Sequence, residues 1–344
     1  MKVLQSLLIA FATNVFRATV SARPTLEAPL YELQTVHQFA NLTWIENIGI
    51  RANGQILATD VGSSRLFLVD PNNTTQASPP VIHQFLRGTT ISGLVEVEDD
   101  VFYTIGSLES NVYNFTFAKN TTKIWQIDLR EYSVTGNTTV SEILALPKVD
   151  VGNGLTLLSK QDGTILIADS EGGLVWILNV HTGEYSIAID HPFLKPIPSA
   201  HPPFGVNGLK VIGSDLYFSN TNKGLLGKFP ISLKKASPTG QPTLVSNNTP
   251  AADDFAVGPD GSVWLTENVR NTLVRVSPNG NITTIAGGVN STALVGPVAA
   301  KFGRGRWDKH VLYVSTDGLL LDAKGNALST AGKIVAVDTS ACEI

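Results

Sequence analysis

Six segments of the chain repeat one pattern of short apolar strands, and this repetition constrains the fold more than any other feature. Each segment begins with a polar or glycine residue and an apolar strand, and a turn, often Asn-Gly or Asp-Gly, leads into a second apolar strand. A polar loop, a third strand and usually a short fourth strand follow. The repeats begin at Trp44, Thr89, Val151, Gly205, Ala252 and Gly296.

Repeats of about 40–50 residues with four strands each are typical of β-propellers. We therefore predict an all-β fold, a six-bladed β-propeller formed by a single domain over residues 23–344. The last repeat lacks an evident fourth strand, whereas residues 32–39 resemble the fourth strand of the first repeat. We expect this N-terminal strand to close the ring on the last blade, which would remove exposed sheet edges. A β-sandwich or two β domains are the alternatives.

Residues 1–22 have the features of a secretory signal peptide: Lys2 precedes a short apolar run, and residues 20–22 are small enough for cleavage. A membrane anchor is the alternative, but the run is shorter than the ~20 residues that a spanning helix needs. We expect a secreted protein, or one in the lumen of the secretory pathway, with no membrane contact after cleavage.

Nine Asn-x-Ser/Thr sequons agree with export, and most stand beside turn-forming residues. They predict N-glycosylation at Asn41, Asn72, Asn73, Asn114, Asn120, Asn137, Asn247, Asn281 and Asn290. Cys342 is the only cysteine of the chain, so an intrachain disulfide cannot form. The net charge of −4 and the lack of a basic block argue against nucleic acid as a partner.

In each repeat, the start of the first strand and the end of the second lie at the same end of the propeller axis, because the two strands form a hairpin. We call this end the mouth, and we predict a small-molecule site there. The positions that open the first strands are Glu46, Ser92, Asn153, Asn207, Asp253 and Gly296. Those that end the second strands are Asp60, Thr104, Asp169, Asn220, Glu267 and Asp317.

Two acids and two amides in the first set are the predicted catalytic residues: Glu46, Asn153, Asn207 and Asp253. Oxygen ligands of this kind suit Ca²⁺ or another hard divalent cation, which makes Glu46, Asn207 and Asp253 candidate metal ligands. The alternative for acidic and amide residues at such positions is hydrogen bonding to their own turns. We expect that structural role for Asp60 and Asp169.

The stretches VGNGLTLLSKQDGTILIADS, GVNGLKV and DDFAVGPDGSVWLTE resemble the regucalcin/gluconolactonase-like six-bladed propellers over nearly the whole mature chain. In the lactonases of that superfamily, a Glu, two Asn and an Asp hold a divalent metal and the substrate. Glu46, Asn153, Asn207 and Asp253 match those positions. The lactonase pattern has glycine after the glutamate and after the aspartate, where this chain has Asn47 and Asp254.

The export features and the VGPVAAKFGR stretch of the last repeat are similar to fungal secreted members of the superfamily, which include hetero-Diels–Alderases of tropolone–sesquiterpene biosynthesis. This resemblance implies a cycloaddition between a quinone methide and a terpene polyene such as humulene, without a cofactor. Such a reaction needs two reactants held together and a hydrogen-bond donor at the quinone-methide oxygen.

For this chemistry, Asn153 and Asn207 would donate hydrogen bonds, and Glu46 or Asp253 would move a proton as the quinone methide forms from its alcohol. The remaining predicted substrate contacts are Tyr103, Phe204, Asn220, Trp264, Glu267 and Phe302. For each aromatic residue among them, the propeller core is the alternative place.

A secreted pericyclase-like enzyme that acts on an apolar small molecule is therefore the leading prediction. A divalent-metal-dependent lactonase or hydrolase and a non-enzymatic binding glycoprotein are the alternatives.

Overall fold

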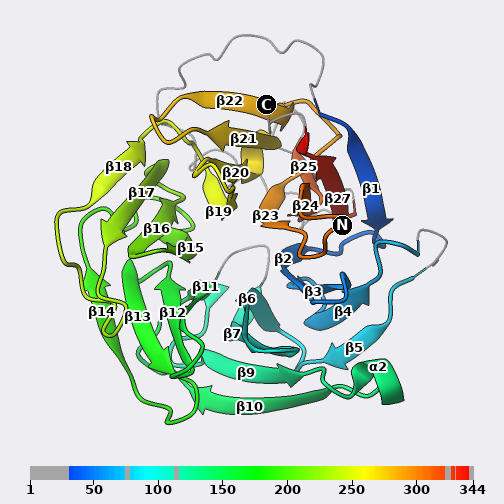
Figure 1. The fold of residues 1–344 in the computed structure, drawn as a ribbon, viewed down its shortest axis with the longest axis horizontal. Helices are drawn as coiled ribbons and strands as arrows, with labels where there is room; N and C mark the ends of the chain where they lie inside the picture. The colour runs from blue at the N-terminus through cyan, green and yellow to red at the C-terminus, as the bar shows by residue number, and fades with distance from the viewer. Residues whose placement is uncertain (1–30, 74–77, 112–115, 322–326, 330, 341–344) are drawn as a thin grey trace.

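Six antiparallel sheets surround a common axis (Figure 1), which confirms the predicted all-β six-bladed propeller. The computed structural model describes residues 31–73, 78–111, 116–321, 327–329 and 331–340. The predicted signal peptide, Asn114 and Cys342 lie outside the described residues. In every blade the chain begins at the axis and moves outward strand by strand, except that the outermost strand of blade six comes from the N-terminal part of the chain.

Four principal strands form each blade. Blade one contains β2 (Ile45–Ile50), β3 (Ile56–Asp60), β4 (Arg65–Val69) and β5 (Val81–Gln84). Blade two contains β6 (Thr89–Glu98), β7 (Val101–Asn111), β9 (Lys123–Asp128) and β10 (Thr139–Ala145), with β8 (Thr116–Phe117) paired to β7. Blade three contains β11 (Gly152–Ser159), β12 (Thr164–Asp169), β13 (Leu174–Asn179) and β14 (Tyr185–Asp190). Blade four contains β15 (Val206–Ile212), β16 (Asp215–Asn220), β17 (Leu225–Pro230) and β18 (Thr243–Ser246). Blade five contains β19 (Ala252–Val257), β20 (Val263–Glu267), β21 (Thr272–Val276) and β22 (Ile282–Gly287). Blade six contains β23 (Pro297–Phe302), β24 (Val311–Thr316), β27 (Lys333–Asp338) and β1 (Leu33–Gln38). The hairpin β25 (Leu319–Leu321) and β26 (Ala327–Ser329) and the short helices α2 (Tyr132–Thr135) and η1 (Asn268–Arg270) lie outside the blades.

The N-terminal strand closes the ring as predicted. β1 pairs antiparallel with β27, from Leu33 opposite Val337 to Gln38 opposite Lys333. The Gln38 side chain adds hydrogen bonds to the carbonyls of Ala331 and Gly332, at 2.7 and 3.1 Å. The outer edge of the last blade is thus covered by a strand from the other end of the chain (Figure 1).

Apolar side chains between neighbouring blades form the core. Among the described residues, six buried clusters each join two adjacent blades. The predicted hairpin turns hold these strands in register: Gly54, Gly163 and Gly261 have φ angles of 88°, 62° and 77°. Glycine adopts this left-handed conformation without the penalty that a Cβ atom brings.

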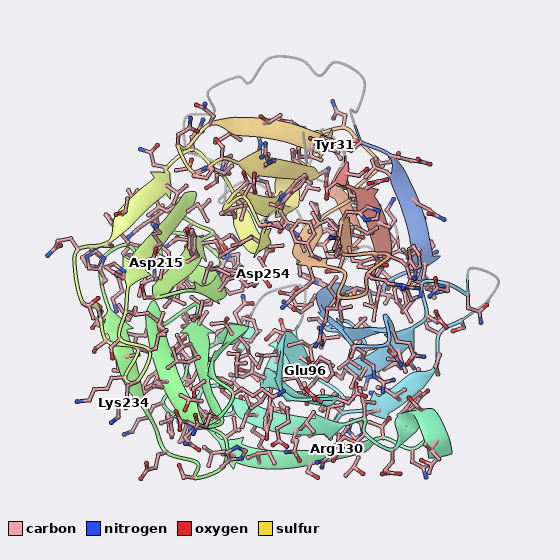
Figure 2. The ribbon with its side chains drawn as sticks, in the orientation of Figure 1. Tyr31, Glu96, Arg130, Asp215, Lys234 and Asp254 are labelled. Carbon is pink, nitrogen blue, oxygen red and sulfur yellow. The ribbon has the colours of Figure 1, made fainter. Side chains whose placement is uncertain are left out.

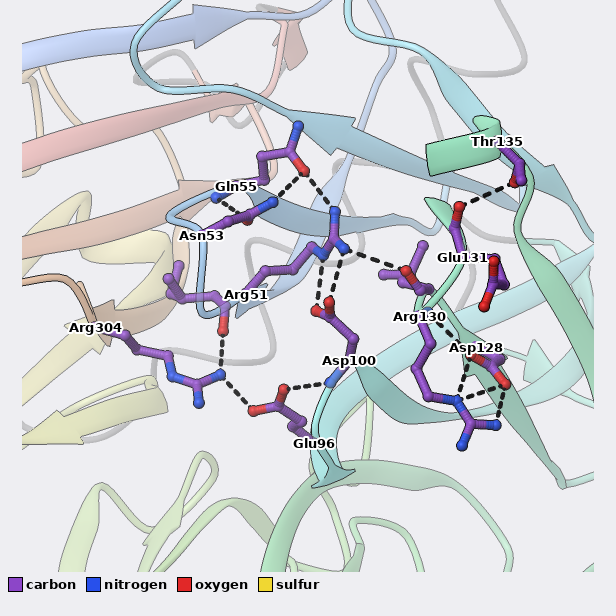
Figure 3. Close-up of polar contacts among 12 residues, drawn as sticks. Arg51, Asn53, Gln55, Glu96, Asp100, Asp128, Arg130, Glu131, Thr135 and Arg304 are labelled. Atoms are coloured by element: carbon purple, nitrogen blue, oxygen red, sulfur yellow. Dashed lines mark hydrogen bonds and ion pairs between the residues drawn. The ribbon is translucent and has the colours of Figure 1, made fainter. Parts of the chain in front are cut away.

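A buried arginine joins blades one and two at the end of the axis opposite the mouth, where an arginine of blade six also binds (Figure 3). Arg51 is fully buried and donates two 2.9 Å hydrogen bonds to the carboxylate of Asp100. It also donates to Gln55 and to the carbonyl of Leu129, at 2.5 and 3.3 Å. Arg304 of the last blade donates to the Ile50 carbonyl at 2.9 Å and pairs with a glutamate of β6 (Figure 3).

Replacing Arg51 by methionine should lower the free energy of unfolding by about 3 kcal/mol, because it removes the hydrogen bonds by which this fully buried guanidinium holds Asp100, Gln55 and the Leu129 carbonyl. Urea unfolding measures the loss. Arg65→Met is the matched control, since Arg65 is exposed and its side chain, among the described residues, hydrogen-bonds to Gln84 alone; it should cost well under ~1 kcal/mol. Equal losses in the two variants would contradict the importance given to the Arg51 network.

Candidate active site

An irregularity in the pairing of the innermost strands determines how the side chains at the mouth are oriented. In all six blades the pairing of the innermost strand with the second strand shifts near its start: after the first paired residue in five blades, and after the third, Ile91, in blade two. Glu46, for example, lies between Ile45, which pairs with Asp60, and Asn47, which pairs with Thr59. Bulges of this kind re-aim side chains out of the regular alternation.

Three positions of the predicted sets need correction. In blade six the irregularity falls between Pro297 and Ala299, so Val298, not Gly296, is the counterpart of Glu46. Because Pro297 pairs with Thr316, Thr316, not Asp317, is the counterpart of Asp60 in that blade. In blade two the residue opposite Ile91 is Gly106, so Gly106, not Thr104, is the counterpart of Asp60. The alignment failed there because β7 is eleven residues long, and its extra length is not visible as a change in hydrophobic pattern.

Hydroxyl groups link the mouth residues from blade to blade. Thr59 donates to the carbonyl of Ser92 at 3.1 Å, Ser219 to that of Asp253 at 2.6 Å, and Thr266 to that of Val298 at 3.0 Å. The backbone of the mouth is therefore held by buried hydrogen bonds, which leaves the side chains at these positions for other tasks.

Buried carboxyl groups gather on one side of the mouth. Burial raises the pKa of Glu46 to about 7, opposed by a 2.6 Å hydrogen bond from the Trp44 indole and reinforced by the charge of Asp254. Burial raises the pKa of Asp317 to about 7 as well, opposed by a 2.9 Å hydrogen bond from Asn268. Asp253 has a pKa well above the ordinary range, because burial comes first and the charges of Glu46, Asp254 and Asp317 add to it. Glu46 and Asp317 can therefore hold and release protons near neutral pH.

Asp254 differs from its neighbours because it stays ionised. Burial alone would raise its pKa, but the ammonium groups of Lys210 and Lys301 outweigh burial and lower it. Lys210 of blade four pairs directly with this carboxylate, and the Asn47 amide of blade one donates to it at 3.2 Å. Figure 2 shows Asp254 beside the axis. The two residues that replace the glycines of the lactonase pattern, Asn47 and Asp254, are therefore hydrogen-bonded to each other.

The candidate metal ligands meet one test of fit. Asn207 donates from its amide nitrogen to Thr221 at 3.0 Å, while its buried Oδ1 atom has no hydrogen-bond partner. An amide oxygen and two carboxyl groups are ligands that Ca²⁺ accepts. Within the described residues, no group of three His, Cys, Asp or Glu side chains is arranged to hold a metal, so any such site would depend on the amide of Asn207.

A pocket opens at the mouth between blades one, two and three, with a volume of about 450 Å³ that includes its opening to solvent. Its lining comprises Trp44, Glu46, Val61, Thr90, Ser92, Glu109, Phe117, Val151, Gly152, Asn153 and Phe204. The predicted residues Glu46, Asn153 and Phe204 thus meet in one pocket. Asn207 and Asp253 lie outside this lining, in blades four and five.

Two long segments of the sequence, residues 108–122 and 191–204, are insertions relative to the repeat pattern, and each contributes residues to this pocket. Phe117 from the first and Phe204 from the second approach each other with ring centroids 6.2 Å apart. The first insertion also contributes Glu109, whose burial raises its pKa to about 8. Sequence reasoning missed Glu109 because it lies outside the repeat pattern, although the length of the insertion marked the region.

The other predicted contacts lie elsewhere. Tyr103 is in the core between blades two and three, and its hydroxyl accepts a 2.8 Å hydrogen bond from Gln126. Trp264 and Phe302 pack edge to face in the core between blades five and six and border a separate hollow near the β19–β20 turn, away from the mouth. For these three aromatic residues the structure agrees with the core alternative, so the predicted aromatic wall is reduced to Phe204.

Several polar residues at the ends of second strands serve local structure. Asn220 donates to the carbonyls of Phe193 and Lys195, at 2.9 and 3.0 Å, and so fastens the second insertion. Glu267 is fully buried, with its carboxylate 3.7 Å from the guanidinium of Arg270. Asp60 and Asp169 accept backbone hydrogen bonds from Gly62 and Gly172 in their own loops, as expected. They also accept backbone hydrogen bonds from the segments that enter the first strand of each blade, at Trp44, Asp150 and Val151.

All eight predicted glycosylation sites that fall in the described residues are exposed. Glycosylation itself stays a prediction. In the described part of the chain, no helix has the length and apolar character needed to cross a membrane.

The fold and the mouth can now be compared with known proteins. No protein-family model matches the chain. A Phoma protein that carries the name hetero-Diels-Alderase is 27% identical over 343 residues, which cover 88% of this chain and 95% of the relative. A Sarocladium schorii protein of the same name is 25% identical over 351 residues, covering 89% of this chain and 83% of the relative. The chain resembles the hetero-Diels-Alderases in sequence.

In structure, the chain is similar to regucalcin, a calcium-binding protein from Agrobacterium tumefaciens, with a TM-score of 0.60. The match covers 90% of this chain and 95% of regucalcin, at 14% identity. A likeness at this identity shows the shared fold alone. Both resemblances predicted from the sequence are thereby confirmed.

Raised carboxyl pKa values should make the protein less stable as the pH rises. A group such as Asp317, with a pKa of about 7 in the folded protein against an ordinary value of 3.8, stabilises the fold fully below pH 3.8 and loses that contribution as the pH rises through 7. The melting temperature should therefore fall between pH 5 and pH 8, and it should fall less in Asp317→Asn. Asn268 can rotate its amide to preserve the hydrogen bond in that variant. Glu184→Gln, which changes an exposed carboxyl, should behave like the wild type; an unchanged fall in Asp317→Asn would contradict the assignment.

Proposed function

We propose that the protein is a secreted pericyclase-like enzyme that joins a quinone methide to a terpene polyene by a hetero-Diels–Alder reaction. The observation that carries the proposal is the mouth pocket, in which apolar walls surround a carboxyl group and an amide. The resemblance to proteins named hetero-Diels-Alderase, along nearly nine-tenths of the chain, supports the same reaction class. Export rests on the predicted signal peptide and sequons.

The pocket walls would bring the reactants together. Trp44, Phe117 and Phe204 offer aromatic surface from blade one and from both insertions. Holding two reactants in reactive geometry removes much of the entropic barrier of a bimolecular reaction, with effects of up to about 7–11 kcal/mol in well-oriented systems. A cycloaddition of this kind forms a carbon–carbon and a carbon–oxygen bond at once and needs no nucleophile.

Asn153 is placed to donate a hydrogen bond to the quinone-methide oxygen. Within the described residues its side-chain amide makes no hydrogen bond, and its backbone is fixed at the bulge of β11. A donor aimed at an oxygen that gains charge in the transition state stabilises that state more than the bound reactants. Glu46, with a pKa of about 7, is suited to take a proton from the ring hydroxyl as the quinone methide forms from its alcohol.

The direct test is to incubate the protein with 2-hydroxybenzyl alcohol and humulene and to follow the adduct by chiral chromatography. We expect one enantiomer, formed faster than in the absence of protein. Asn153→Ala should lower the rate about 100-fold without changing the melting temperature, as loss of an oxyanion donor does. The control is Gln241→Ala, which removes an exposed amide between β17 and β18, far from the predicted sequons and the pocket lining. A racemic adduct at the background rate would contradict the proposal.

A metal-dependent lactonase is the second candidate, favoured by the unpartnered Oδ1 atom of Asn207. Glu46, Asn207 and Asp253 would hold the divalent cation, which would polarise a lactone carbonyl when bound.

For this second candidate we expect Ca²⁺ to raise the melting temperature of dialysed protein, and chelation to reverse the rise, because a ligand that binds only the folded state stabilises it. Asn207→Ala should remove the effect. A melting temperature that is insensitive to Ca²⁺, Mg²⁺ and Zn²⁺ would eliminate the lactonase candidate.

A further inference from the structure

Glu109 occupies the mouth pocket in a way that no structural role explains. It lies in the part of β7 that extends beyond the second strands of the other blades, in the first insertion. Its backbone is fixed on both sides: its N–H donates to the carbonyl of Gly88 at 2.9 Å, and the residue pairs with Phe117 of β8. The side chain is thus carried on rigid strand structure, and it lines the same pocket as Glu46, Asn153 and Phe204.

The carboxyl group of Glu109 has an oxygen atom that lacks a hydrogen-bond donor in the described part of the chain. This atom, Oε1, is shielded from solvent and has no hydrogen-bond partner among the residues that the structure describes. In the described part of the chain no Lys, Arg or His forms an ion pair with it. Buried carboxyl groups are normally paired or hydrogen-bonded, because an unmet acceptor in a dry site is costly. A carboxyl left in this state at the wall of a pocket is available to a ligand.

The surroundings make this group an acid rather than a base. Burial alone raises its pKa to about 8, so it carries a proton at neutral pH and can donate an O–H hydrogen bond. Glu46 is the only other titratable side chain among the described pocket residues, and the indole of Trp44 hydrogen-bonds one of its oxygens. One pocket therefore holds two carboxyl groups in different environments, an arrangement that separates acid and base roles.

We propose that Glu109 is the proton donor of this site. It protonates the benzylic hydroxyl group of the alcohol substrate, and the carbon–oxygen bond breaks so that the group leaves as water. Glu46 accepts the proton of the ring hydroxyl, and the electron pair of that O–H bond forms the carbonyl of the quinone methide. The pocket is open to solvent, from which Glu109 regains its proton and to which Glu46 releases the proton it has accepted. This inference rests on the proposed function and adds to it the residue that starts the reaction.

The test separates formation of the quinone methide from its capture. In one reaction the substrate is 2-hydroxybenzyl alcohol, whose hydroxyl must be protonated to leave. In the other, the quinone methide is released by photolysis of 2-(dimethylaminomethyl)phenol, which needs no acid from the protein. Humulene is the second reactant in both. Adduct and enantiomeric excess are measured for the wild type, Glu109→Gln and the control Glu184→Gln.

We expect Glu109→Gln to convert the alcohol about 100-fold more slowly than the wild type, within the range for loss of a general acid. It should still capture the photogenerated quinone methide with the wild-type enantiomeric excess. Conversion of the alcohol by the wild type and by Glu184→Gln should fall as the pH rises through about 8, where Glu109 loses its proton. That fall should be missing from the residual activity of Glu109→Gln.

Each other outcome overturns a defined statement. If Glu109→Gln converts the alcohol at the wild-type rate and with the wild-type pH profile, Glu109 is not the proton donor, while the proposed function stands. If the wild type yields no enantiomeric excess from the alcohol or from the photogenerated quinone methide, the proposed function is wrong, and so is the role of Glu109. Should Glu109→Gln not fold, Glu109→Asp keeps the acid and must retain the alkaline fall at a reduced rate.

Discussion

Closure of the ring by β1 is the constraint on which the rest of this structure depends. The pairing of β1 with β27 covers the outer edge of blade six and leaves all six innermost strands facing one axis. Only in a closed ring do blades one and six become neighbours, with the β2 and β23 strands in contact. Asn47 of blade one can then reach Asp254 of blade five across the mouth. The site is therefore a product of closure rather than of any single blade.

Two departures from regular strand geometry convert this scaffold into a site. The bulge at the start of each innermost strand turns the mouth residues out of the alternating pattern, and blade-to-blade hydrogen bonds from hydroxyl groups hold their backbone in place. Burial then raises the pKa values of the carboxyl groups at the mouth. Asp254 is the exception, because two lysines lower its pKa and keep it charged. Of these groups, Glu46 lines the mouth pocket together with Glu109, and their pKa values of about 7 and about 8 suit the movement of a proton within one pocket.

Much of the fold could be read from local pattern, whereas the site could be read only in part. Positions such as Glu46, Asn153, Asn207 and Asp253 were found because they share one phase of the repeat. Glu109 was missed because it belongs to an insertion, and the residues of an insertion have no equivalent positions in the other repeats with which they could be aligned. Trp264 and Phe302 were expected near the substrate, but an aromatic residue in a propeller strand looks the same in sequence whether it faces a pocket or the neighbouring blade.

The sequence by itself determined the number of blades, the strand that closes them and the tight turns at Gly54, Gly163 and Gly261, because each of these depends on residues close together in the chain. Only the tertiary structure decided which polar side chains share a pocket and which of them hold a proton. Those properties depend on burial and on distances across the axis: Asn47 and Asp254 are 207 residues apart in the chain and hydrogen-bonded in the folded protein. No local pattern records such a contact, since it exists only after all six blades are in place.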